Sequence, residues 1–244
     1  MAKEKPRGDI INHSEAADYV APTDPLLLSR LEWFQDQKLA LMVHWGGYSQ
    51  WGICESWPLS DADASWSRRD VDWESDPACF RRQYFALNRT FHPVRFQPEA
   101  WARFAKDAGF RYLIFTTKHH DGFCLFDSKY TEYKATNTKA GRDLVKEYVE
   151  AVRAEGLKVG LYFTLLDWYH DDYPHYQDRN HPMRNHPECG NENRNFNRYL
   201  DYMHGQVREL CENYGKLDIM WFDFSYGDLR GEAWRATELV KMVR

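Results

Sequence analysis

The sequence of 244 residues has no long apolar run and no stripe of basic residues. A membrane-spanning helix needs about 20 consecutive apolar residues, so the first absence speaks against a membrane protein. The 32 basic residues are outnumbered by 37 acidic ones, and a net charge of −5 disfavours a nucleic-acid partner. The N-terminus lacks the apolar segment of a signal peptide. We therefore expect a cytoplasmic protein.

Signatures of nucleotide and metal sites are also missing. No G-x-G-x-x-G and no Walker sequence follows the first apolar run, which disfavours a nucleotide-binding doubly wound sheet. The five cysteines are odd in number and form no C-x-x-C pair, which argues against a disulfide framework and a structural zinc site. They are Cys54, Cys79, Cys124, Cys189 and Cys211.

Aromatic residues, by contrast, are abundant. They make up 16% of the chain, with 10 Trp, 15 Tyr and 14 Phe. Sugar rings stack well on flat aromatic faces, although aromatic side chains also fill cores. A hydrophobic content of 43% excludes a disordered chain. The composition therefore indicates a folded protein and gives a first hint of a carbohydrate ligand.

Apolar strands and helices alternate along the chain. We predict strands at residues 39–43, 112–115, 158–163 and 217–222. Helices are predicted at residues 26–37, from 76 onward, and at 98–108, 143–155, 195–213 and 231–244, after an irregular lead-in of residues 1–24. Strands that are apolar throughout and joined by helices are typical of a parallel sheet buried on both faces.

Polar side chains lie in or just after the last residues of each predicted strand. They are His44, His119 with His120, Tyr162, and Asp223. Reactive residues of a (β/α)8 TIM barrel lie at the C-terminal ends of its strands, so this α/β fold is the one we predict. Four strands make about half of such a barrel. We therefore interpret residues 1–244 as the N-terminal portion of a single TIM-barrel catalytic domain, without its C-terminal half or any accessory β-domain.

Two long loops interrupt the alternation. Residues 48–75 carry four tryptophans, and a loop of this length is usually functional. These tryptophans are Trp51, Trp57, Trp66 and Trp73. The second loop extends to about residue 193 and is rich in Pro and Asn. We expect its histidines to be solvated: His170, His175, His181 and His186.

From about Leu31 onward, the ordered motifs at the strand ends resemble those of the α-L-fucosidases, family 29 of the glycoside hydrolases. The matching pieces are His44-Trp45-Gly46, Thr117-Lys118-His119-His120-Asp121-Gly122-Phe123, Gly160-Leu161-Tyr162, Leu166-Asp167-Trp168 and Ile219-Met220-Trp221-Phe222-Asp223. The resemblance implies retaining exo-hydrolysis of terminal α-linked L-fucose from an oligosaccharide or glycoconjugate, without a cofactor. It leaves the oligomeric state and the preferred linkage open.

The resemblance also implies roles for individual residues. Asp223 is the nucleophile that forms a glycosyl-enzyme intermediate, and Trp221 is part of the pocket wall. The hydroxyl groups of the sugar are bound by His44, His119, His120 and Tyr162. Glu55 and Trp57 resemble a Glu-Trp pair that also contacts the substrate. In many members that pair is adjacent, whereas Ser56 separates it here.

A retaining glycosidase needs two carboxyl groups about 5–5.5 Å apart, and the resemblance assigns only the nucleophile within this chain. In the family the proton-donating glutamate and a pocket arginine follow the nucleophile strand. We expect both downstream of Arg244. The segment Phe224-Ser225-Tyr226 departs from the small residues common after the nucleophile.

Other interpretations stay open. One is a metal-dependent barrel hydrolase with His44, His119, His120 and Asp223 as ligands, although no H-x-H occurs on the first strand. Another is a catalytically incomplete, fucose-binding fragment. For single residues, Asp223 could cap the last helix, and His44 could be a core histidine bonded to backbone.

Overall fold

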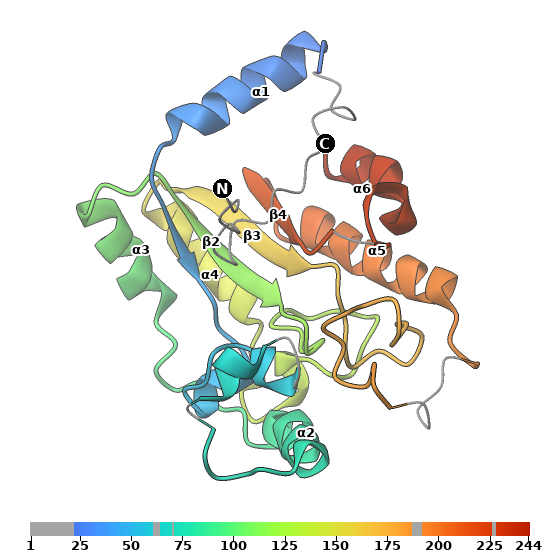
Figure 1. Ribbon diagram of the computed structural model, residues 1–244. Coiled ribbons are helices and arrows are strands. Elements are labelled where there is room, and N and C mark those ends of the chain that lie inside the picture. Colours follow the sequence, from blue (N-terminus) through green and yellow to red (C-terminus); the bar gives the residue numbers. More distant parts are fainter. Residues whose placement is uncertain (1–21, 61–63, 70, 187–191, 226–227) are drawn as a thin grey trace, which may run out of the picture. The chain divides into compact units, whose positions relative to one another are not determined.

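The computed structural model describes residues 22–60, 64–69, 71–186, 192–225 and 228–244 (Figure 1). Most of the predicted lead-in therefore lies outside the described residues. The chain divides into two compact units, Met1–Lys38 and Leu39–Arg244. Among the described residues, no helix is both long enough and apolar enough to cross a membrane.

In the first unit, the described part is helix α1, Pro25–Asp36. Its start follows the sequence signals, because Asp24 Oδ1 accepts a hydrogen bond from the Leu26 N–H at 2.8 Å and Pro25 occupies the first turn. None of its residues is buried.

The second unit is built on a four-stranded parallel sheet with the order β1-β2-β3-β4 (Figure 1). The strands are β1 Ala40–Val43, β2 Tyr112–Lys118, β3 Lys158–Thr164 and β4 Ile219–Asp223. Val43 pairs with Phe115, and Thr164 pairs with Asp223, so the carboxyl ends meet at one edge. Consecutive parallel strands joined by helices are the repeat of a (β/α)8 barrel, and the predicted fold class is confirmed.

Helices follow the strands along the chain. They are α2 Pro77–Phe85, α3 Pro98–Asp107, α4 Leu144–Ala154, α5 Phe196–Asn213 and α6 Ala236–Val243. Side chains of Asp76, Asp143 and Asn195 cap the starts of α2, α4 and α5. The prediction of one helix over residues 231–244 was wrong in its first part: residues 231–234 form a 3-10 turn, and Arg235 has a left-handed φ of 50° that separates this turn from α6.

Side chains of the central strands alternate between two apolar clusters. Leu113, Phe115 and Leu161 belong to the main core, in which α3 and α4 pack against β2 and β3 (Figure 1). Tyr112, Ile114, Tyr162 and their neighbours form a smaller cluster on the opposite, inner face. β2 is buried throughout, whereas β1 and β4 are only half-buried because each has one neighbouring strand in this sheet. The expectation that the first strand is buried on both faces was therefore wrong.

A buried ion pair holds the loop after β3 to the end of β2. Lys118 is completely buried, and its Nζ lies 3.0 Å from Asp167 Oδ2. The other oxygen of Asp167 accepts hydrogen bonds from the N–H groups of Tyr169 and His170. Gly122 in the preceding turn has a φ of 74°, and a Cβ at this position would collide with Asp167 Oδ1. The lysine, the aspartate and the glycine of the motif thus form one structural unit.

Lys118→Met leaves the Asp167 carboxylate buried without its partner and is expected to lower the free energy of unfolding by about 3–5 kcal/mol. Lys118→Met combined with Asp167→Asn removes both charges and keeps an oxygen for the two backbone donors, so it should recover a large part of that loss. Urea unfolding measures both. Lys106→Met, in the exposed pair with Glu155, is the control and should cost less than about 1 kcal/mol. Equal losses in the single and double variants would contradict this account.

Candidate active site at the carboxyl ends of the strands

Asp223 ends β4 with both carboxylate oxygens held by donors. Its Oδ2 accepts a hydrogen bond from the Tyr162 hydroxyl at 2.6 Å, and its Oδ1 accepts one from the Phe224 N–H at 3.0 Å. Burial, and then the charge of Asp223, raise the pKa of Tyr162 well above its usual value, so the phenol stays a donor. Phe224 has a left-handed φ of 66°, a conformation costly for a non-glycine residue and often found at functional sites. Two donors therefore fix the direction of the carboxylate.

The histidines that directly follow β1 and β2 lie beside the same tyrosine. The Tyr162 ring lies 4.8 Å from the ring of His44 and stacks on His119 at 5.8 Å. The structure thus brings Asp223, Tyr162, His44 and His119 together, as the strand-end pattern suggests. Asp223 does not cap a helix, because α6 begins only at Ala236. We call these four residues with Glu55 the polar bowl.

Glu55 completes the polar bowl from the loop after β1. Its Oε2 lies 3.1 Å from His119 Nε2, and its Oε1 lies 3.7 Å from His44 Nε2. Burial raises the pKa of Glu55, but the hydrogen bond that His119 donates to it acts in the opposite direction, and the pKa lies below its ordinary value. Glu55 has a left-handed φ of 52° as well. A strained backbone therefore holds an ionised carboxylate against two histidines.

Ser56, the residue that separates Glu55 from Trp57, is completely buried and takes part in the site. Its Oγ lies 2.6 Å from His119 Nδ1. His119 is therefore held from both sides, by Ser56 and by Glu55. The Nδ1 of His44, which directly follows β1, lies 2.9 Å from Thr116 Oγ1. His44 is therefore bonded to a side chain and also lies in the polar bowl.

His120 lies behind the polar bowl in an aromatic enclosure. Its ring is 4.6 Å from Phe224, 4.9 Å from Trp57 and 5.1 Å from Trp168. Its Nδ1 lies 2.7 Å from Thr164 Oγ1, whereas its Nε2 has no hydrogen-bond partner among the described residues. Burial, and then the neighbouring His119, lower the pKa of His120 well below its ordinary value. His120 is therefore neutral at physiological pH.

The two predicted tryptophans lie on different sides of the site. Trp57 packs between His120, Trp168 and Phe224, and its ring is also 6.3 Å from the exposed Trp66. Trp221 is 44% exposed and, by the alternation of β4, shares a face with Asp223. One tryptophan thus supports the histidines, and the other is open to solvent beside the carboxylate.

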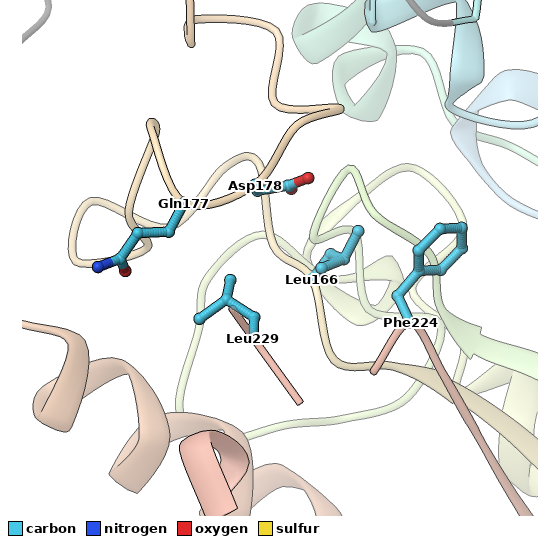
Figure 2. Close-up of a pocket in the computed structure, with 5 residues that line it drawn as sticks. All are labelled: Leu166, Gln177, Asp178, Phe224 and Leu229. Atoms are coloured by element: carbon cyan, nitrogen blue, oxygen red, sulfur yellow. The ribbon is translucent and has the colours of Figure 1, made fainter. Parts of the chain in front are cut away.

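A small, shallow hollow lies on another side of Phe224. Figure 2 shows its lining, in which the Phe224 ring, Leu166 and Leu229 surround the space and Asp178 comes from the loop after β3. The Asp178 carboxylate is buried and accepts hydrogen bonds from Trp168 Nε1 at 2.8 Å and from the Tyr173 hydroxyl at 3.1 Å. Asp178 therefore ties this loop to the aromatic enclosure of His120.

Comparison with known proteins identifies the family of the chain. The sequence profile of the family described as alpha-L-fucosidase matches residues 10–244. The chain belongs to the α-L-fucosidase family.

Several relatives agree with this assignment. Mouse tissue alpha-L-fucosidase is 34% identical over 58% of this chain and 31% of its own length, and the rice putative alpha-L-fucosidase 1 is 32% identical over 85% and 33%. Among solved structures, alpha-L-fucosidase isoenzyme 1 from Paenibacillus thiaminolyticus has a TM-score of 0.78 and 52% identity, covering 89% of this chain and 48% of that chain. The Lactobacillus casei alpha-L-fucosidase AlfC with α-L-fucose has a TM-score of 0.68 and 28% identity, covering 88% and 67%. The chain thus spans about a third of these curated relatives and half of the Paenibacillus enzyme.

The metal-site alternative expected four ligands that the structure does not assemble. In the described part of this fucosidase-family chain, the metal-type donors that gather within 4.8 Å of one another belong to His44, Glu55 and His119. His120 and Asp223 are outside this group. His120 Nδ1 is bonded to Thr164, and Asp223 Oδ2 to Tyr162. The expected ligand set was therefore wrong in two of its four members.

Sequence reasoning missed the residues that hold the site together. The hydroxyls of Ser56, Thr116 and Thr164 carry no motif of their own, and only the strand alternation gave a signal for the two threonines. The prediction of solvated histidines in the second loop was also wrong for two of them: His175 and His181 are buried, with ring centroids 4.3 Å apart. A loop rich in Pro and Asn can still pack when its own side chains fill it.

These buried histidines predict a pH dependence of stability. Burial, and then the charge of Arg194, lower the pKa of His175 to about 4, and burial lowers that of His181 well below its usual value. The pKa of a histidine in the unfolded chain is about 6.5, so below that pH the unfolded chain binds more protons than the folded chain. The free energy of unfolding should therefore fall as the pH drops from about 6.5 towards 4. Urea unfolding at several pH values measures this decrease.

The decrease should be smaller in His175→Gln than in the unchanged chain, because this variant removes one of the protonating groups. His92→Gln, at an exposed histidine, is the matched control. A decrease of the same size in His175→Gln, in the control and in the unchanged chain would show that the loop histidines do not cause it.

Proposed function

We propose that the polar bowl binds the terminal α-L-fucose of an oligosaccharide or glycoconjugate, and that Asp223 cleaves it with retention of configuration. The observation that carries the proposal is the doubly held Asp223 carboxylate, which shares the polar bowl with His44, His119 and Glu55. A carboxylate whose direction is fixed is suited to attack one carbon atom. The histidines and Glu55 offer the donors and acceptors that sugar hydroxyls need.

In the proposed first step, an Asp223 carboxylate oxygen forms a bond to the anomeric carbon as the bond from that carbon to the leaving oxygen breaks. The leaving oxygen takes a proton from a general acid. Water then attacks the anomeric carbon of the glycosyl-enzyme and gives its proton to the conjugate base of that acid, while the bond to the Asp223 oxygen breaks and restores the free carboxylate. The Tyr162 hydroxyl and the Phe224 N–H would hold the Asp223 carboxylate in position before attack.

Glu55 is poorly suited to be the proton donor of this reaction. Its pKa lies below the ordinary range, and a general acid works best when its pKa is near the working pH. Its hydrogen bond with His119 suits the other role, in which it accepts from sugar hydroxyls. The proposed assignment of Glu55 is therefore substrate binding.

The substrate class is supported by the relatives. AlfC has been solved with Fuca(1,6)GlcNAc and with 4-nitrophenyl-α-L-fucopyranoside. We propose the same class for this chain, a fucose unit linked to another sugar, without choosing the linkage.

A mechanism-based label tests the role of Asp223. 2-Deoxy-2-fluoro-α-L-fucosyl fluoride carries a leaving group that needs little help from a general acid, and its 2-fluoro group slows release of the intermediate. We expect mass spectrometry to find one fluorofucosyl group, located by peptide mapping on Asp223, and expect Asp223→Asn to abolish it. Asp228→Asn, at an exposed aspartate five positions on, is the matched control and should be labelled normally. A label on another carboxylate, or no label on a chain that binds L-fucose in calorimetry, would overturn the assignment.

A further inference from the structure

Three hydroxyl groups at the rim of the sheet each contact the Nδ1 atom of a different histidine. The pairs are Ser56 with His119 at 2.6 Å, Thr116 with His44 at 2.9 Å, and Thr164 with His120 at 2.7 Å. We propose that these hydroxyls hold the rings and, together with Glu55 at His119, fix the ring tautomers, so that His119 and His120 carry their proton on Nε2 and His44 carries it on Nδ1. Ser56, Thr116 and Thr164 are then positioning residues. Only the consequence for the sugar rests on the proposed function.

For His119, the carboxylate of Glu55 decides the tautomer. Glu55 Oε2 is 3.1 Å from His119 Nε2, and a carboxylate only accepts hydrogen bonds, so this nitrogen carries the proton. The neutral ring then has a lone pair on Nδ1, and the Ser56 hydroxyl donates to it. Ser56 is completely buried, so the pair is shielded from competing water.

For His120, the backbone of the next loop decides the tautomer. Thr164 Oγ1 accepts a hydrogen bond from the Leu166 N–H at 3.2 Å, which leaves its own proton available for His120 Nδ1 at 2.7 Å. The ring proton of His120 is therefore on Nε2, in the aromatic enclosure. A buried donor without a partner is costly, so this N–H is set to meet an acceptor on a ligand.

For His44, the backbone of β1 decides the opposite tautomer. Thr116 Oγ1 donates to the carbonyl of Val43 at 3.2 Å, and it therefore accepts from the N–H at Nδ1 of His44. The Nε2 of His44 is left as an acceptor. It faces Glu55 Oε1 across 3.7 Å, a distance too long for a hydrogen bond between them.

The arrangement of His44 and Glu55 has a chemical consequence. Two acceptors, His44 Nε2 and Glu55 Oε1, face one another. A ligand hydroxyl group that donates to one of them would fit this site. A neutral sugar carries such donors, whereas a ligand without a hydroxyl group at this point would leave both acceptors unpaired. The tautomer of His44 would thus contribute to selecting a hydroxylated ligand.

Histidine ring tautomers can be read directly by NMR. We would record two-bond ¹H–¹⁵N correlation spectra of the unliganded chain near pH 7, and assign the three signals with single His→Gln variants. The expected result is an Nε2–H ring for His119 and His120 and an Nδ1–H ring for His44. The opposite form at any of the three positions in the unchanged chain overturns the proposal for that position.

Variants of the hydroxyls test the cause. Thr116→Val should turn His44 partly or wholly to the Nε2–H form, and Thr116→Ser should restore Nδ1–H. Thr164→Val should disturb His120 in the same way, with Thr164→Ser as a restoring variant. Ser56→Ala should leave His119 in the Nε2–H form, because Glu55 still accepts from Nε2. Thr117→Val is the matched control, because that buried threonine of the same strand donates to the Tyr162 carbonyl. Unchanged tautomers in Thr116→Val and Thr164→Val, or equal changes in the control, contradict the proposal.

Calorimetry with L-fucose gives a second readout. Loss of the His44 acceptor in Thr116→Val should weaken binding about tenfold, and Thr116→Ser should restore it. The two proposals fail separately. The expected tautomers in a chain that does not bind L-fucose would count against the proposed function alone, and L-fucose binding with the opposite tautomers would count against the hydroxyl assignment alone.

Discussion

The register between β3 and β4 is the constraint on which the site depends. It places Tyr162 opposite Trp221 and Thr164 opposite Asp223, so the tyrosine can reach the carboxylate with its hydroxyl group. A shift of one residue would turn the side chain of Asp223 to the other face of the sheet. The carboxylate would then enter the apolar core beside the helices. The geometry of the Asp223 carboxylate therefore depends on strand pairing before it depends on the loop.

One face of the sheet forms the apolar core, and the other carries the candidate site. One face is apolar and packs against helices, and the other changes from apolar to hydroxyl-bearing residues near its carboxyl end, where Thr116 and Thr164 meet the histidines. Behind the histidines, the buried pair of Lys118 and Asp167 closes the turn, and the Trp168 N–H donates to the His120 carbonyl at 2.7 Å. The loop after β2 thus presents rings whose positions are set by the strands.

Much of this could be predicted from the sequence. Continuous apolar runs, Asp and Asn caps and first-turn prolines located the strands and most helices, because these signals are local. The strand-end rule also grouped His44, His119, Tyr162 and Asp223 correctly in space. The roles of these residues, the proton donor, the cytoplasmic location and the oligomeric state stay predictions.

The remaining features depend on contacts between distant residues. Ser56 reaches His119 across 63 positions, and no local pattern distinguishes it from any loop serine. Asp223 is held by the Tyr162 hydroxyl from the neighbouring strand and by the backbone N–H of Phe224, and neither hydrogen bond has a local sequence signal. Likewise, β2 extends to Lys118, beyond the apolar run, because Thr116 and Lys118 find partners in neighbouring segments. Packing of this kind overrides composition.

The central claim is that one bowl holds the sugar between Asp223 and the histidines. A crystal structure of the chain with L-fucose tests it most directly. The account predicts the anomeric carbon about 3–3.5 Å from an Asp223 carboxylate oxygen, with ring hydroxyls on His44 and Glu55. A fucose bound elsewhere, for example on Trp66, or one whose anomeric carbon faces away from Asp223, would contradict it.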